Sequence, residues 1–223
     1  MIFENWNLID YETALERQMS YASGVFEKRR PSTVIFCSHP PIVTLGRKTK
    51  AADVGTWAGQ QLHVNRGGSA TYHGPSQIVG YPILDLKLLG CDLHSHLRSI
   101  ETAVVNALLR IGIAARGRQH ENAEATGVWV GDRKIASIGI GVRNWVSLHG
   151  FALNVDHDAQ AFEGIQPCGF KKETMTSVEE VIGQKIDRAR LLKFLEDAFR
   201  SQFSDYTESA TVAARLVSAD LKD

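Results

Sequence analysis

The sequence predicts an α/β fold of the α+β type, in which helices flank a mixed β-sheet. Strand-like runs outnumber helical ones, and a Gly131–Asp132 turn between two of them indicates a hairpin. Helix-period apolar patterns occur in only a few places, so strict alternation of strands and helices is not expected. The chain has 223 residues, 43% hydrophobic and 22% charged, which suits one globular domain over residues 1–223.

The first half of the chain alternates a few helices with strand-like runs. After a short opening strand, Asp10 is placed to cap a helix that ends by Pro31. Its apolar residues near helical spacing are Tyr11, Leu15, Met19, Ala22 and Phe26. Strands bounded by Gly, Pro or charged residues are expected at 32–38, 42–46, 61–65 and 77–86. An amphipathic helix is expected over 92–113, with Leu97, Ile100, Val104, Leu108 and Ile111 on one face.

The second half begins with a predicted hairpin over 126–142 and a further strand over 145–155. A short helix is expected over 177–183, and Asp187 is placed to cap a helix that carries Leu191, Leu195 and Phe199. Residues from about 205 to 223 are expected to form a peripheral tail. Together these elements give the predicted mixed sheet with helices beside it.

The charge balance argues against partners that bind through a strong overall field. Lys+Arg and Asp+Glu are equal at 25 each, so neither nucleic acid nor an anionic membrane surface is an expected partner. The basic pairs at 29–30, 47–48 and 171–172 are solvated faces or, if they share one side, a surface for an acidic partner. The N-terminus is acidic, unlike a secretory signal or transit peptide.

The three cysteines are widely spaced and include no C-x-x-C pair, which favours a reducing compartment and predicts the cytoplasm. Cys37 ends an apolar strand and is expected in the core. Cys91, His94 and His96 lie at a helix start where their side chains diverge, so no metal site is predicted.

The stretch "RGGSATYHGPSQ" (66–77) combines glycines and a proline with Arg66, Tyr72, His73 and Gln77. Glycine lets the backbone approach a ligand, and successive N–H groups beside an arginine bind a carbonyl or an anion. The alternative is an elaborate hairpin. The sequence has no G-x-x-x-x-G-K-[ST] loop and no strand-associated G-x-G-x-x-G, so neither a P-loop nucleotide nor a dinucleotide is indicated.

Lys134 enters the strand "KIASIGIG", which is rich in small residues. It is either a solvated hairpin lysine or an ammonium that faces a reacting thiol across space left by Ser137, Gly139 and Gly141. The sequence does not choose between these positions.

Cys168 lies between Pro167 and Gly169, in a turn that suits a reactive thiol. A thiol of pKa about 8.5 is only about 3% thiolate at pH 7, and a cation that lowers the pKa by ~1.5 units makes it about half thiolate. A lysine is a suitable cation. His73 and His149 are candidate histidine partners that orient or bind rather than ionise the thiol.

Five motifs in this order resemble the bacterial lipoyl (octanoyl) transferases over most of the chain. They are "HPPIVTLGR" (39–47), "RGGSATYHGPSQIVGYPILDL" (66–86), "GVWVGDRKIASIGIGV" (127–142), "HGFALNV" (149–155) and "GIQPCGF" (164–170). The resemblance implies the mixed α/β catalytic domain shared with biotin and lipoate protein ligases.

The resemblance also implies roles for individual residues. Cys168 matches the family's acyl-accepting cysteine, and Lys134 matches the lysine that tunes it. The residues matching the substrate loop and the two sides of the acyl channel are Arg66, Gly67, Gly68, Ser69, Ala70, Thr71, Tyr72 and His73, then Ser137, Ile138 and Gly139, then Gly150, Phe151 and Ala152. Ser69, Ala70 and Ser76 depart from the family's usual residues, which bears on loop shape and chain-length preference.

The implied reaction is octanoyl transfer from acyl carrier protein to a lysine of lipoate-dependent enzymes, through an acyl-cysteine. The implied donor group is carried on phosphopantetheine, with no ATP and no metal. The implied acceptors are the lipoyl domains of 2-oxoacid dehydrogenase E2 subunits and the glycine cleavage H protein, and a monomer is expected. Three alternatives are an ATP-dependent lipoate ligase, a non-catalytic module that binds acyl carrier or lipoyl domains, and amide-to-amide transfer between lipoyl domains. Such ligases usually carry an S-G-G-G loop and need no cysteine in a P-C-G turn.

Overall fold

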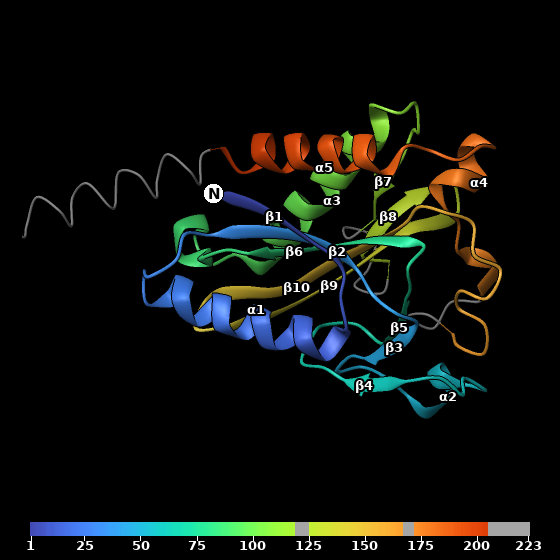
Figure 1. The fold of residues 1–223 in the computed structure, drawn as a ribbon, viewed down its shortest axis with the longest axis horizontal. Coiled ribbons are helices and arrows are strands. Elements are labelled where there is room, and N and C mark those ends of the chain that lie inside the picture. Colours follow the sequence, from blue (N-terminus) through green and yellow to red (C-terminus); the bar gives the residue numbers. More distant parts are fainter. Residues whose placement is uncertain (119–124, 167–171, 205–223) are drawn as a thin grey trace, which may run out of the picture.

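A computed structural model describes residues 1–118, 125–166 and 172–204 (Figure 1). Its centre is a seven-stranded sheet in the order β1-β2-β6-β10-β9-β8-β7. The strands β1 and β2 are parallel and the other neighbours are antiparallel. Their bounds are β1 Ile2–Leu8, β2 Thr33–Ser38, β6 Gln77–Ile83, β7 Arg116–Gly117, β8 Gly127–Val130, β9 Arg133–Arg143 and β10 Val146–Asn154. The predicted mixed sheet is therefore confirmed.

Helices cover both faces of this sheet. Figure 1 shows α3 and α5 together on one side and α1 on the other. The bounds are α1 Tyr11–Phe26, α3 Leu93–Leu109, α4 Val178–Ile182 and α5 Arg188–Gln202, with short 3₁₀ turns η1 Leu86–Leu89 and η3 Lys172–Thr174. Aspartates cap the three long helices by accepting backbone N–H groups, which satisfies donors that a helix start leaves open. These caps are Asp10 and Asp187, as predicted, and Asp92, for which no cap was predicted.

A second, smaller sheet lies beside the first and contains β4-β3-β5. Its strands are β3 Ile42–Leu45, β4 Gln61–His63 and β5 Ala70–His73, and the short helix α2 Ala51–Val54 lies between β3 and β4. The strand β5 pairs with β3, whereas β6 pairs with β2 and β10. The stretch 66–77 is therefore a passage between two sheets and not a hairpin.

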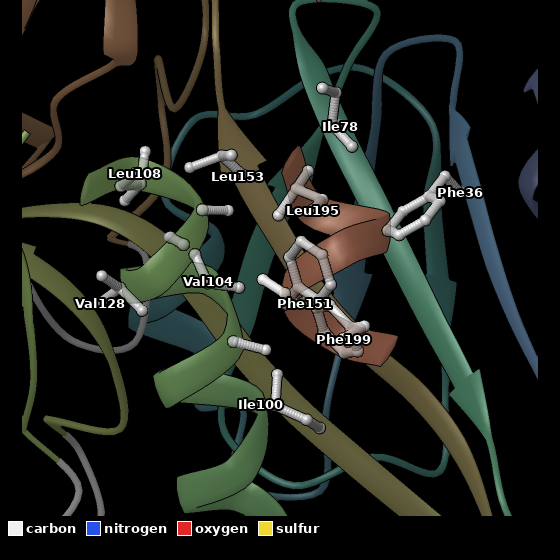
Figure 2. Packing of buried hydrophobic residues seen from close by; sticks show 14 of the residues in the cluster. Phe36, Ile78, Ile100, Val104, Leu108, Val128, Phe151, Leu153, Leu195 and Phe199 are labelled. Carbon is white, nitrogen blue, oxygen red and sulfur yellow. The ribbon is translucent and has the colours of Figure 1, made fainter. Parts of the chain in front are cut away.

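The main core lies between the large sheet and the helices α3 and α5 (Figure 2). Phe151 of β10 stacks on Phe199 of α5 with ring centroids 5.4 Å apart, and Phe36 of β2 meets Phe199 edge-on. Full burial of side chains of this size stabilises the fold by about 1.5–3 kcal/mol each. This core fixes β9 and β10, whose opposite face forms part of the candidate site.

One predicted helix face was partly wrong. Phe26 is 46% exposed, while Gln18 of the same helix is fully buried. Gln18 is drawn inward because its Oε1 accepts the backbone N–H of His149 at 2.9 Å, a contact that apolar periodicity does not reveal. The short elements α2, β5 and β7 were also not predicted, because two to four residues carry no periodic pattern.

Candidate active site

A β-bulge determines where the side chain of Lys134 lies. Along β8 and β9, Val128 is opposite Ala136 and Trp129 is opposite Lys134, so Ile135 is an extra residue on β9. Ile135 and Ala136 consequently both pack into the main core. Directly paired residues of an antiparallel ladder share a face, so the bulge puts Lys134 on the same face as Ser137, away from the core.

The side chain of Lys134 is enclosed. Only 1% of the residue is exposed, which excludes the solvated hairpin position. Its Nζ lies 5.5 Å from the centroid of the Trp129 ring, and a methyl group on Gly127 would come within 2.5 Å of its Cε. The backbone carbonyl of Lys134 accepts the N–H of Thr176 at 3.0 Å. A fully buried lysine is rare unless neighbouring groups stabilise its charge, in contrast to a lysine on the surface.

A narrow cavity of about 30 Å³ lies on this same face of the large sheet. It is bounded by β6, β9 and β10, by the segment that leads into β5, and by the first residue of α1. The lining residues are Tyr11, Arg66, Gly68, Thr71, His73, Val79, Tyr81, Ser137, Ile138, Gly139, His149, Gly150, Phe151 and Ala152. Segments from three distant parts of the sequence therefore form one site.

Most of the predicted substrate-contacting residues line this cavity, and four do not. Gly67, Ser69, Ala70 and Tyr72 lie outside its lining. Because strand side chains alternate, Thr71 and His73 face the cavity while Ala70 and Tyr72 pack into a separate cluster with Phe162. The Oγ1 of Thr71 is buried and has no hydrogen-bond partner among the described residues, so it is available to a bound group.

Arg66 fixes the glycine loop against the small sheet. It is 5% exposed, and its Nη2 donates to the carbonyl and the Oγ1 of Thr44, both at 2.8 Å. On the other side, the N–H of Gly67 donates to the carbonyl of Ile140 at 2.8 Å, which attaches the loop to β9. The guanidinium therefore introduces a buried positive charge at the cavity.

Gly139 is needed for this close approach. A methyl group at this position would lie 2.8 Å from the carbonyl oxygen of Gly67, closer than atoms of this kind normally approach. We expect Gly139→Ala to displace the loop and to lower kcat/KM for the acyl transfer that the resemblance implies by about 10- to 100-fold, equivalent to an overpacking cost of about 1–3 kcal/mol. Steady-state kinetics measure the effect, with thermal unfolding as the folding control. Unchanged kcat/KM in a folded variant would contradict this role.

Buried histidines and tyrosines form the floor of the cavity next to Arg66. His39 Nδ1 donates to the carbonyl of Ile9 and Tyr81 Oη donates to His39 Nε2, both at 2.7 Å, which fixes a neutral tautomer. Tyr11 Oη lies 3.4 Å from His149 Nδ1. Burial lowers the pKa of His39 to about 4, and burial together with the Arg66 charge lowers the pKa of His149 to about 3. Burial likewise lowers the pKa of His73 well below 6.5. These groups are neutral at pH 7.

Because these buried histidines are neutral, the stability of the fold is expected to fall in acid. A histidine whose pKa is lower in the folded state binds its proton first in the unfolded state, so stability falls as pH drops through about 6.5 toward about 4. For His39 the full difference corresponds to about 3 kcal/mol. Urea unfolding from pH 7 to 4 should show a shallower loss for His39→Gln than for the wild type or the exposed control His63→Gln. Equal slopes in all three would contradict the account.

Cys168 lies outside the described residues, but the segments on both sides of 167–171 are held near the site. The N–H of Gln166 donates to the carbonyl of Asp53 at 2.8 Å. Ile165 and Met175 pack in one cluster with Ala70 and Tyr72. The backbone of Met175 also forms an isolated β-bridge with that of Lys134. Only one residue separates Gln166 from Cys168 in the sequence.

The remaining cysteines and histidines considered from the sequence do not line the cavity. Cys37 is 4% exposed in the core, as predicted, and burial raises the pKa of its thiol far above the ordinary value. His96 is buried against Phe203, whereas His94 is exposed, so these two side chains do not converge. No group of three or more metal-ligating side chains occurs among the described residues.

Sequence reasoning missed three cavity residues and gave His149 only a general role. Tyr11 was assigned to the core face of a helix, and Val79 and Tyr81 to an ordinary strand. For His149 the available sequence signal is its place before Gly150 in a motif, and the structure adds a positive φ of 59°. The approach of α1 to β10 could not be predicted from local patterns.

A model of the lipoyl protein ligase A/B catalytic domain matches residues 10–200. The chain belongs to this family of acyl-group enzymes. Among curated relatives, an octanoyltransferase of Bdellovibrio bacteriovorus is 44% identical, with 84% of this chain and 91% of the relative covered. An octanoyltransferase of Pelobacter propionicus is 34% identical, with 94% and 99% covered. The resemblance and the acyltransferase class predicted from the sequence are thus confirmed.

Solved structures support the predicted fold. A bipartite lipoate protein ligase from Thermoplasma acidophilum superposes with a TM-score of 0.64 at 17% identity, covering 91% of this chain and 83% of that one. A biotin protein ligase from Aquifex aeolicus gives 0.53 at 12% identity, covering 93% and 70%. At these identities the likeness concerns the fold alone. No helix within the described residues has the length and apolar composition needed to cross a membrane.

Proposed function

We propose that this chain transfers an octanoyl group from the phosphopantetheine thioester of acyl carrier protein to a lysine of lipoyl domains, through an acyl thioester on Cys168. One observation carries the proposal. The cavity joins Arg66–His73 to the 137–139 and 150–152 segments on the face of β9 that also carries Lys134. Octanoyltransferase relatives at 34–44% identity over most of the chain supply the reaction class.

The cavity has the character expected of an acyl site. Val79 and Ala152 provide apolar walls, while Gly139 and Gly150 bring backbone close to the space between them. A volume of about 30 Å³ holds only about two water molecules, since one needs roughly 10–15 Å³. An octanoyl chain therefore enters only when lining side chains move.

In the first step the Cys168 thiolate attacks the thioester carbonyl. A carbon–sulfur bond to Cys168 forms, the bond to the pantetheine sulfur breaks, and the departing thiolate takes the proton of the Lys134 ammonium, which leaves Lys134 neutral. The Lys134 ammonium, enclosed beside Trp129, stabilises the attacking thiolate. Arg66 and the open Oγ1 of Thr71 supply polar contacts for the acyl carbonyl region.

In the second step the acceptor lysine attacks the acyl-cysteine. Its side chain is an ammonium with an ordinary pKa of about 10.4, so it must first lose one proton to solvent before the amine attacks. Acylation removes the negative charge of Cys168, which lowers the tendency of Lys134 to hold its own proton. Lys134 then accepts the proton from the acceptor amine, the amide bond forms, and the Cys168 thiolate is released.

The energy of the thioester drives amide formation, so the proposed reaction needs neither ATP nor a metal. Acceptors are lipoyl domains of 2-oxoacid dehydrogenase E2 subunits and the glycine cleavage H protein, and the chain acts as a cytoplasmic monomer. The rival with a specific basis is an ATP-dependent lipoate ligase, because the fold is shared with such ligases. A non-catalytic binding module would need neither Lys134 nor Cys168, and amide-to-amide transfer would require a different donor.

The test is a reconstituted transfer followed by the mass of the acceptor. The purified chain is mixed with a lipoyl domain and either octanoyl acyl carrier protein without nucleotide, free octanoate with Mg-ATP, or an octanoylated lipoyl domain. A lipoyl domain whose acceptor lysine is arginine is the control. Modification only in the first arm is expected. Modification only with Mg-ATP would establish a ligase, and only from the lipoyl domain would establish amide transfer.

A further inference from the structure

The turn after β3 carries three exposed cationic side chains, Arg47, Lys48 and Lys50, which we name the basic turn. None of the three forms an ion pair with a carboxylate in the described parts of the chain. Some other exposed cations are neutralised locally, as Arg29 is by Glu27. In a chain of zero net charge, the basic turn is therefore a local excess of positive charge.

The acid nearest to the basic turn in sequence does not offset this charge. Asp53 is only 7% exposed, and its carboxylate accepts the backbone N–H of Lys50 at 2.8 Å and the hydroxyl of Ser69. The carboxylate is thus used internally, to tie α2 to the glycine loop. The three cationic groups stay directed to solvent.

The backbone of the basic turn is fixed to the loop that forms the cavity. The N–H of Arg47 donates to the carbonyl of Arg66, and the N–H of Lys48 donates to the carbonyl of Gly68, both at 3.1 Å. Gly68 lines the cavity. A methyl group on Gly46 would come within 2.5 Å of the Gly68 oxygen, so the two backbones lie as close as they can. The positive charge of the basic turn is therefore held beside the loop that lines the cavity.

We propose that the basic turn binds an acidic face of the carrier protein that delivers the acyl thioester. This inference rests on the proposed function. Uncompensated charge beside an active site attracts a partner of opposite sign and speeds its association. The other protein substrate must present a lysine ammonium, which the same charge repels, so the basic turn suits the donor and not the acceptor.

The experiment compares Arg47→Glu/Lys48→Glu with Lys28→Glu/Lys185→Glu, a matched charge reversal at exposed lysines outside the basic turn. Acylation is measured with three donors, namely octanoyl carrier protein, octanoyl-4′-phosphopantetheine and octanoyl-pantetheine. We expect kcat/KM for the carrier protein to fall by about 10- to 100-fold in the first variant only, with a weaker dependence on salt. Rates with both small donors should stay within about twofold of wild type.

Several results would overturn the inference. An equal loss in the lysine control would indicate a general field effect, and a loss with octanoyl-4′-phosphopantetheine would assign the turn to the phosphate of the arm. A defect confined to transfer onto the lipoyl domain would assign it to the acceptor, and unchanged kinetics would remove any role. If none of the three donors acylates the wild type, the proposed function is refuted. This outcome separates the proposed function from the role of the basic turn.

Discussion

Replacement of Cys168 by alanine is expected to lower octanoyl transfer to a lipoyl domain by on the order of 10⁴-fold. The proposed reaction passes through a bond to this sulfur, and no other cysteine replaces it. Cys37 is buried, and burial raises the pKa of its thiol, so it remains protonated and inaccessible. Transfer rates measured by acceptor mass give the effect, with thermal unfolding to show that the variant is folded.

Cys91→Ala is the matched control, because Cys91 is partly exposed and lies just before the helix α3, outside the cavity lining. It should transfer octanoate within about twofold of wild type. A Cys168→Ala protein that keeps a tenth or more of the wild-type rate would show that the carrier thioester is attacked directly by the acceptor lysine. The covalent mechanism would then be wrong.

Replacement of Lys134 should separate the two steps. Lys134→Met removes the charge and should slow both acylation and transfer by about 10³-fold. Lys134→Arg keeps a cation that does not deprotonate, so it should keep acylation within about tenfold while transfer falls by about 10³-fold. Single-turnover measurements of acyl-enzyme formation and of its reaction with a lipoyl domain give the two rates.

Enclosure of the lysine calls for a folding control in this experiment. Gly127 leaves no free space beside Lys134 Cε, so the larger guanidinium must be accommodated by small shifts of β8. Thermal unfolding of both variants measures the cost of this change. Equal slowing of both steps in a folded Lys134→Arg protein would contradict the role of Lys134 as the base in transfer.

The sequence predicted the regular elements well because their signals are local. Asp10, Asp92 and Asp187 mark helix starts that the structure contains, and the Gly131–Asp132 turn joins two paired strands. The position of the Lys134 side chain could not be predicted in the same way. Simple alternation would place it on the face of Ala136, and only the extra residue Ile135 moves it to the face of Ser137.

Contacts between distant elements account for the rest of the site. Tyr11 reaches the cavity because α1 packs against the large sheet, and Gln18 is buried because it binds the backbone of His149. The motif at 66–77 indicated a ligand loop, but its division into cavity-facing and outward-facing residues depends on β5 joining the small sheet. Pairing of this kind is set by the whole fold and has no local signature.

Intact-protein mass spectrometry after mixing the chain with octanoyl acyl carrier protein, without nucleotide, tests the central claim most directly. The account predicts one octanoyl group on the wild type, none on Cys168→Ala, and its loss from the wild type when a lipoyl domain is added. An octanoyl group on neither protein, with acceptor modification appearing only after ATP and free octanoate are supplied, would contradict the account and establish a ligase.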